Sequence, residues 1–242
     1  MPCFSIHRAK HDEIVNHSLH TPLKGYPETS HIKPKIAICG FGMMGKEIAT
    51  KMLTRGCTVR VYDTDHGLLL SASNHVRTKL ASLYLPTAVE TMMERFSTAQ
   101  SLDDLVGNDF RIAVEAATED IDLKIAIFRK MVEIFKVNCI APSKVIMLSN
   151  TVSCDLRSIA SQLDPAFCKR CIGLRFLQPV ILNDDVLLRF QSTYQALFPP
   201  LMLKQFLEAL HLREVNSAMV ESTPYTLHVP RNGLFLRAWN RR

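Results

Sequence analysis

The stretch whose residue types and spacing point most directly to chemistry is "GFGMMG" (40–45), a G-x-G-x-x-G pattern. It follows the apolar run "KIAICG" and opens a segment of helical periodicity, so we expect a strand, a tight turn and a helix. In such a turn Gly40 permits the sharp bend, Gly42 lets the backbone approach a diphosphate, and Gly45 lets helix and strand pack closely. The positive end of the helix dipole and its free N–H groups then attract the anion.

A carboxylate stands where this turn would need one for a dinucleotide. A second apolar run, "CTVRVYD", ends at Asp63, 18 residues after Gly45, and completes a strand–turn–helix–strand unit of 29 residues. At that position Asp63 would accept hydrogen bonds from the adenosine ribose hydroxyls and would repel a 2′-phosphate. The sequence therefore predicts an NAD site, with Met43 and Met44 in its phosphate-binding turn. The alternative is an ordinary glycine turn with Asp63 as a strand-end residue.

The elements that must position these residues follow from the pattern of the remaining chain. Near-continuously apolar strands alternate with helical segments, which indicates a parallel sheet covered on both faces. We therefore predict an α/β fold, a Rossmann-type, doubly wound, mainly parallel sheet. Beyond the first unit we expect an interrupted helical segment at 66–107, strands at 111–117, 144–150, 171–177 and 214–220, helices at 121–136 and 199–210, and a short helix capped by Ser153.

The charge distribution separates the central part of the chain from its two ends. The net charge is +6, of which residues 1–35 contribute +2 and residues 225–242 contribute +4, while the rest sums to zero. We read residues 1–34 as a flexible leader, 35–222 as a Rossmann domain and 223–242 as an irregular basic tail. Because the excess charge lies in the two ends and not in a groove, we expect no nucleic-acid partner.

Other features limit the location and the chemistry of the site. No run of about 18 apolar residues is present, so we expect no membrane span. The N-terminus lacks the apolar core of a signal peptide, and Asp12 and Glu13 argue against a mitochondrial transit peptide, which favours a cytoplasmic location. Seven cysteines, an odd number, fit reduced thiols. Cys168 and Cys171 form a C-x-x-C without a second ligand pair, so we expect no metal.

Four segments, in this order, resemble the NAD-binding domain of the 3-hydroxyacyl-CoA dehydrogenase family over roughly residues 34–180. They are "KIAICGFGMMGKEIA", "VEAATEDIDLKIAIF", "LSNTVS" and "IGLRFLQPV". The resemblance implies an oxidoreductase that binds NAD through the three glycines of the turn and Asp63.

The resemblance also implies roles for polar residues in the middle of the chain. It places Glu119 and Lys124 against the nicotinamide half of NAD. It places Ser149 and Asn150 near nicotinamide and substrate, and gives Ser149 a catalytic role. The alternatives are a first-turn Glu119 that is favoured by a helix dipole, and a Ser149 that caps the end of a strand.

The catalytic half departs from the family pattern. Where the family has G-L-H-F-F-N-P, this chain has "GLRFLQP", so Arg175 occupies the catalytic histidine position and Gln178, which we expect to bind cofactor, replaces the asparagine. The carboxylate that usually follows the histidine by about a dozen residues would fall near Leu187. Oxidation of a 3-hydroxyacyl thioester needs a base for the hydroxyl proton, and arginine remains protonated. The resemblance therefore implies weak or absent hydroxyacyl-CoA activity.

Two interpretations of Arg175 are open. It would bind an anion beside the nicotinamide, either a cofactor phosphate or an acidic ligand, or it would pair with Asp184, Asp185 or Glu119 and have only a structural role. An acyl-CoA or another acidic small molecule is therefore a candidate partner, and the oligomeric state is open.

Three functions are compatible with these observations. The first is NAD(H) binding by a sensing or interaction protein. The second is an active oxidoreductase of the same family on 3-hydroxyacyl-CoA or a related 3-hydroxy acid, with His211 or His228 as distant candidates for the base. The third is a truncated product of a longer gene, because about 60 residues follow Pro179, too few for the family's C-terminal helical domain.

Overall fold

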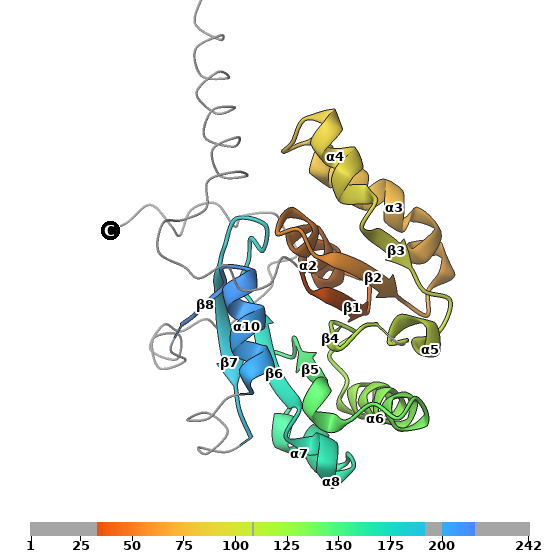
Figure 1. Cartoon of the computed structure of the whole chain (residues 1–242), viewed down its shortest axis with the longest axis vertical. Coiled ribbons are helices and arrows are strands. Elements are labelled where there is room, and N and C mark those ends of the chain that lie inside the picture. Colours follow the sequence, from red (N-terminus) through yellow and green to blue (C-terminus); the bar gives the residue numbers. More distant parts are fainter. Residues whose placement is uncertain (1–32, 108, 192–199, 216–242) are drawn as a thin grey trace, which may run out of the picture. The chain divides into compact units, whose positions relative to one another are not determined.

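A computed structural model describes residues 33–107, 109–191 and 200–215, which form one eight-stranded sheet with helices on both faces (Figure 1). The strands are β1 Lys35–Cys39, β2 Thr58–Tyr62, β3 Phe96–Thr98, β4 Ile112–Glu115, β5 Ile146–Ser149, β6 Cys171–Phe176, β7 Asp185–Arg189 and β8 Arg213–Glu214. The helices are α2 Met43–Thr54, α3 His66–Ala81, α4 Pro86–Met93, α5 Leu102–Leu105, α6 Ile121–Val137, η1 Pro142–Lys144, α7 Leu156–Ser161, α8 Pro165–Cys168 and α10 Leu201–Ala209.

The strand order confirms the predicted doubly wound fold. The order is β3-β2-β1-β4-β5-β6-β7-β8, and every pair is parallel except β6 with β7. The chain runs outward from β1 on one side and then returns to begin β4 on the other side, so the order reverses between β1 and β4. In open α/β sheets ligands bind at the carboxyl ends of the strands at such a reversal. The glycine-rich turn lies there, directly after β1.

Alternation along the strands divides the core into two layers. In β1, Ile36 and Ile38 pack into a layer with α2, α3, α4 and α10, whereas Ala37 and Cys39 pack into the other layer with α5, α6, α7 and α8. All four side chains are buried. Because helices cover both faces of the central strands, polar side chains from this part of the sheet reach a ligand only at the strand ends.

Two strands and one helix cap differ from the expectations. β3 lies inside the segment expected to be an interrupted helix; its three residues are only half-buried, so it lacks the apolar run that marks the central strands. β7 was also not expected. The sequence pattern predicts strands separated by helices, whereas β7 follows β6 after a short connection and pairs with it in the antiparallel direction. Asp155, and not Ser153, caps α7 by accepting hydrogen bonds from the N–H groups of Arg157 and Ser158.

Several predicted segments lie wholly or largely outside the described residues. They are the leader, the basic tail and most of the strand expected at 214–220, of which residues 214 and 215 are described and only Glu214 belongs to β8. No helix in the described ranges combines the length and the apolarity needed to cross a bilayer.

Candidate functional site

The glycine-rich turn has the geometry that a phosphate-binding turn requires. Gly40 has a φ of +98°, and a Cβ at this residue would lie 2.5 Å from the backbone nitrogen of Ala117. A Cβ at Gly45 would lie 1.9 Å from the carbonyl oxygen of Gly40, so helix and turn are in direct contact. A Cβ at Gly42 would meet nothing within 4 Å, and no side chain caps α2 there. Open space therefore faces the start of α2, where a diphosphate would approach.

Asp63 lies beside this turn, at the end of β2. Its Oδ2 accepts a hydrogen bond of 2.6 Å from the N–H of Phe41, and its Oδ1 accepts one of 2.9 Å from the N–H of Asp65. The carboxylate thus holds the turn against the second strand. Since each carboxylate oxygen can accept a further hydrogen bond, the ribose contact expected of Asp63 stays a prediction.

A buried ionic network closes the ends of β4 and β5. Glu115 is the last residue of β4 and is register partner to Ser149, the last residue of β5. One carboxylate oxygen of Glu115 accepts hydrogen bonds of 2.7 Å from the Lys124 ammonium and from the Ala117 N–H, and the other accepts one of 2.6 Å from the Ser149 hydroxyl. Glu115 and Ser149 have no exposed surface, and Lys124 is 1% exposed. The pair therefore meets the condition for a buried ion pair, which is that its members are hydrogen-bonded.

Glu119 extends this network to the turn that follows β5. Its Oε1 accepts hydrogen bonds from the Thr151 hydroxyl at 2.6 Å and from the N–H groups of Val152 and Ser153 at 2.8 and 2.7 Å. Its Oε2 lies 3.5 Å from the Lys124 ammonium. Burial alone would raise the pKa of Glu119, but these hydrogen bonds hold it well below its usual range. Lys124 therefore links two carboxylates that together fix the strand ends.

The structure brings the predicted residues Glu119, Lys124 and Ser149 into this one network. Two further members, Glu115 and Thr151, were missed. The signal for Glu115 was available, because an acid at the end of a buried strand requires a partner. The placement of Glu119, Lys124 and Ser149 against the nicotinamide half of NAD stays a prediction.

The predicted residues on either side of the network also have defined contacts. Asn150 accepts a hydrogen bond of 3.0 Å from the Phe176 N–H and so joins β5 to β6. The Gln178 amide nitrogen lies 3.0 Å from the sulfur of Met44, so the segment after β6 reaches the start of α2. Met43, the neighbour of Met44, is 75% exposed. The turn after β1 and the turn after β6 thus border the same edge of the sheet.

Arg175 lies half-buried on β6, on the face opposite to Leu174 and Phe176. Within the described residues, Arg175 forms no hydrogen bond or ion pair with any of the three acids that the structural interpretation named, although the charge of Glu119 attracts it. Asp184 forms ion pairs with Lys51 and Arg55. Asp185 forms an ion pair with Arg213, with 2.8 Å between the guanidinium nitrogen and the carboxylate oxygen. Glu119 is held as described above.

Among the described residues, no hydrogen bond or ion pair to Arg175 is formed. Burial and then the like charge of Arg189 lower its pKa, and only the longer-range attraction of Glu119 acts against them.

No described histidine takes the place of the family's base. The described histidines are His66 and His75 on α3 and His211 after α10, and both helices pack into the layer opposite to Arg175. His228, the other candidate, lies outside the described residues.

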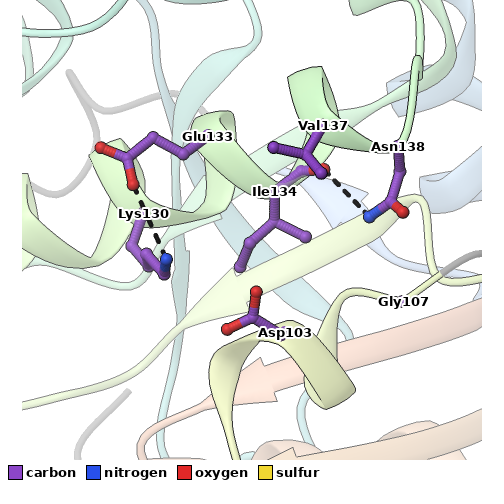
Figure 2. Close-up of a pocket in the computed structure, with 7 residues that line it drawn as sticks. All are labelled: Asp103, Gly107, Lys130, Glu133, Ile134, Val137 and Asn138. Atoms are coloured by element: carbon purple, nitrogen blue, oxygen red, sulfur yellow. Dashed lines mark hydrogen bonds and ion pairs between the residues drawn. The ribbon is translucent and has the colours of Figure 1, made fainter.

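A pocket of about 390 Å³ lies in a different part of the fold, and Figure 2 shows the side chains that line it. It lies between α5 and the carboxyl end of α6, whereas Glu119 precedes the amino end of α6. Lys130, the first α6 residue in its lining, follows Lys124 of the network by six residues, which is about 9 Å along the helix axis. Its lining residues are Asp103, Gly107, Lys130, Glu133, Ile134, Val137 and Asn138.

Comparisons with known proteins identify the family. Residues 35–186 match the family described as "3-hydroxyacyl-CoA dehydrogenase, NAD binding domain". The 3-hydroxybutyryl-CoA dehydrogenase of Bradyrhizobium diazoefficiens is 28% identical over 170 residues, which are 68% of this chain and 55% of that protein. The 3-hydroxyadipyl-CoA dehydrogenase of Escherichia coli is 26% identical over 149 residues, 60% of this chain and 29% of that protein.

Solved structures agree with this assignment at the level of the fold. The structure of (S)-3-hydroxybutyryl-CoA dehydrogenase from Ralstonia eutropha superposes with a TM-score of 0.63 at 24% identity, over 76% of this chain and 63% of that one. This chain spans 55% or less of the length of the two curated relatives described above. It belongs to the 3-hydroxyacyl-CoA dehydrogenase family and carries the family's NAD-binding domain.

Proposed function

We propose that this member of the 3-hydroxyacyl-CoA dehydrogenase family binds NAD(H) at the carboxyl edge of its sheet and has weak or absent activity on 3-hydroxyacyl-CoA. The observation that carries the second half of the proposal is Arg175, which stands where the family has its histidine base. In this view the protein senses the dinucleotide or presents it to a partner.

The chemistry of the base supports this proposal. Oxidation of a 3-hydroxyacyl thioester would send a hydride to NAD and leave a proton to be removed. A guanidinium group carries five N–H donors and no acceptor, so Arg175 cannot accept that proton. Loss of general acid–base assistance typically reduces a rate about 10²–10⁴-fold, which corresponds to about 3–5 kcal/mol.

The cofactor-binding half supports the first part of the proposal. We assign the diphosphate to the turn at 40–45 and the adenosine ribose to Asp63. NAD, once bound, supplies hydride transfer at its nicotinamide ring. Because Lys124 and Ser149 are almost fully buried and bonded to Glu115, we assign them the positioning of the strand ends against which the nicotinamide half would lie.

The test combines cofactor binding and turnover in one sample. Purified protein is titrated with NADH by fluorescence, and acetoacetyl-CoA is then added while absorbance at 340 nm is followed. We expect NADH to bind and absorbance to stay constant. Gly42→Ala should fold, because its methyl group enters open space, yet it should weaken NADH binding at least about 10-fold, because the methyl group stands where a diphosphate approaches.

Three outcomes decide between the functions. Absence of NADH binding would contradict the proposal. Turnover by the wild-type protein would favour the second function, an active oxidoreductase with another base. Turnover that appears only in Arg175→His would show that the missing base alone silences the reaction.

A further inference from the structure

Two arginines lie next to each other on β6 and β7. The antiparallel register pairs Gly173 with Arg189 and Arg175 with Leu187, so the two arginines are diagonal neighbours on one face of the sheet. Gly173 provides the space for this arrangement, since a Cβ there would lie 2.8 Å from the Cβ of Arg189. The Arg189 guanidinium donates a hydrogen bond of 3.2 Å to the Val152 carbonyl, in the turn after β5.

The register also places this pair beside the buried network. Ser149 is the partner of Gly173, so one row across the sheet contains Glu115, Ser149, Gly173 and Arg189. Arg175 lies two residues further along β6, just beyond the end of β5. Both guanidinium groups therefore stand at the edge where the candidate site lies.

The local charge around the two arginines is not balanced by acids. Each nearby carboxylate has another cation: Glu115 and Glu119 share Lys124, Asp184 has Lys51 and Arg55, and Asp185 has Arg213. Within the described residues, Arg189 repels Arg175, and the attraction of Glu119 opposes this repulsion only in part. Such a pair is suited to an anion from outside.

The position of the pair decides between the two anions considered from the sequence. The diphosphate turn follows β1, and β6 lies three strands away in the order β1-β4-β5-β6. Adjacent strands are about 4.8 Å apart, so the two positions are separated by about 14 Å. A cofactor diphosphate held at the start of α2 would lie three strands from Arg175, so we assign the anion to a second ligand.

We propose that Arg175 and Arg189 form a binding site for a carboxylate, so that the second ligand of this protein is a small organic acid. The planar guanidinium fork matches the two oxygens of a carboxylate, and two forks on one face can hold it from two sides. At this edge the acid would lie beside the nicotinamide of bound NAD. That location rests on the proposed function, whereas the anion site itself does not.

The experiment measures carboxylate binding separately from cofactor binding. Malonate is titrated into the full chain by calorimetry at low ionic strength, with and without saturating NADH, and sulfate is titrated in parallel. The variants are Arg175→Met and Arg189→Met, which remove a charge but keep an unbranched side chain. Arg77→Met is the control, because Arg77 is an exposed, ion-paired arginine on α3. Circular dichroism and urea unfolding verify that each variant is folded.

We expect wild type to bind malonate more tightly than sulfate, and each site variant to lose at least about 10-fold in malonate affinity while Arg77→Met keeps it. Equal malonate affinity in wild type and both site variants would overturn the proposal. Sulfate binding as tight as malonate binding would overturn its carboxylate specificity. If NADH fails to bind but malonate binding still depends on both arginines, the proposed function is wrong and the carboxylate site stands.

Discussion

Two cations at the same edge of the sheet, Lys124 and Arg175, are held in opposite ways. Lys124 is almost completely buried and lies within hydrogen-bond or ion-pair distance of Glu115 and Glu119. Arg175 is half-buried and, among the described residues, forms no hydrogen bond or ion pair; the charge of Arg189 repels it and that of Glu119 attracts it. The first cation is part of the architecture, because its removal would leave buried carboxylates unpaired. The second contributes no contact that the fold needs, which is the pattern expected of a residue kept for a ligand.

The largest expected effect is the loss of the buried cation. Lys124→Met would leave the fully buried Glu115 without its counter-charge, so we expect the free energy of unfolding to fall by about 3–5 kcal/mol. Urea unfolding of the wild-type protein and Lys124→Met at pH 7 measures this loss of stability. The double variant Glu115→Gln with Lys124→Met removes both charges and should recover more than half of the loss. If Lys124→Met alone lowers the free energy of unfolding by less than about 1 kcal/mol, the proposed difference between Lys124 and Arg175 is wrong.

The sequence predicted the local parts of this site better than its long-range parts. The turn at 40–45 and its helix are encoded by local glycine spacing and apolar periodicity, so both were predicted from the sequence. The contact between Glu115 and Lys124 also spans few residues, but it forms only because β4 ends where α6 begins. The neighbourhood of Arg175 and Arg189 depends on the antiparallel return of β7, which no local pattern indicated.

A smaller effect, with a distinct pH dependence, is expected at Glu119. Glu119→Gln removes the charge that accepts hydrogen bonds from the turn after β5, and we expect it to cost about 1–2 kcal/mol at pH 7, reduced because the side chain is 36% exposed. The folded pKa of Glu119 lies below its unfolded value. Its stabilisation is therefore fully present above the unfolded pKa of about 4.3 and is lost as the pH falls towards the folded value.

Unfolding of wild type and Glu119→Gln at pH 7 and at pH 3 tests this dependence. The difference between the two proteins should shrink at the lower pH. The control is Glu133→Gln, an exposed acid 3.7 Å from Lys130, which should change stability by a few tenths of a kcal/mol at either pH. A difference between wild type and Glu119→Gln that grows on acidification would show that the turn is held in another way.

The smallest expected effect belongs to Arg175 and completes the comparison with Lys124. Arg175→Met removes a charge that, within the described residues, forms no hydrogen bond or ion pair and is repelled by Arg189. We therefore expect the free energy of unfolding to change by no more than about 0.5 kcal/mol, with a gain as the favoured direction. The corresponding replacement of a cation by Met at Lys124 is expected to cost several times more free energy of unfolding. The matched pair thus separates a cation that stabilises the fold from one that does not.

Added malonate should make the wild-type protein more stable than Arg175→Met, which reverses their order of stability without malonate. A ligand that binds only the folded state stabilises it in proportion to the logarithm of its concentration over its dissociation constant. Malonate should therefore raise the unfolding temperature of the wild-type protein and leave that of Arg175→Met nearly unchanged, whereas without malonate the variant should be at least as stable. A loss of several kcal/mol in Arg175→Met without any ligand would mean that Arg175 is structural after all, and the difference between the two cations would disappear.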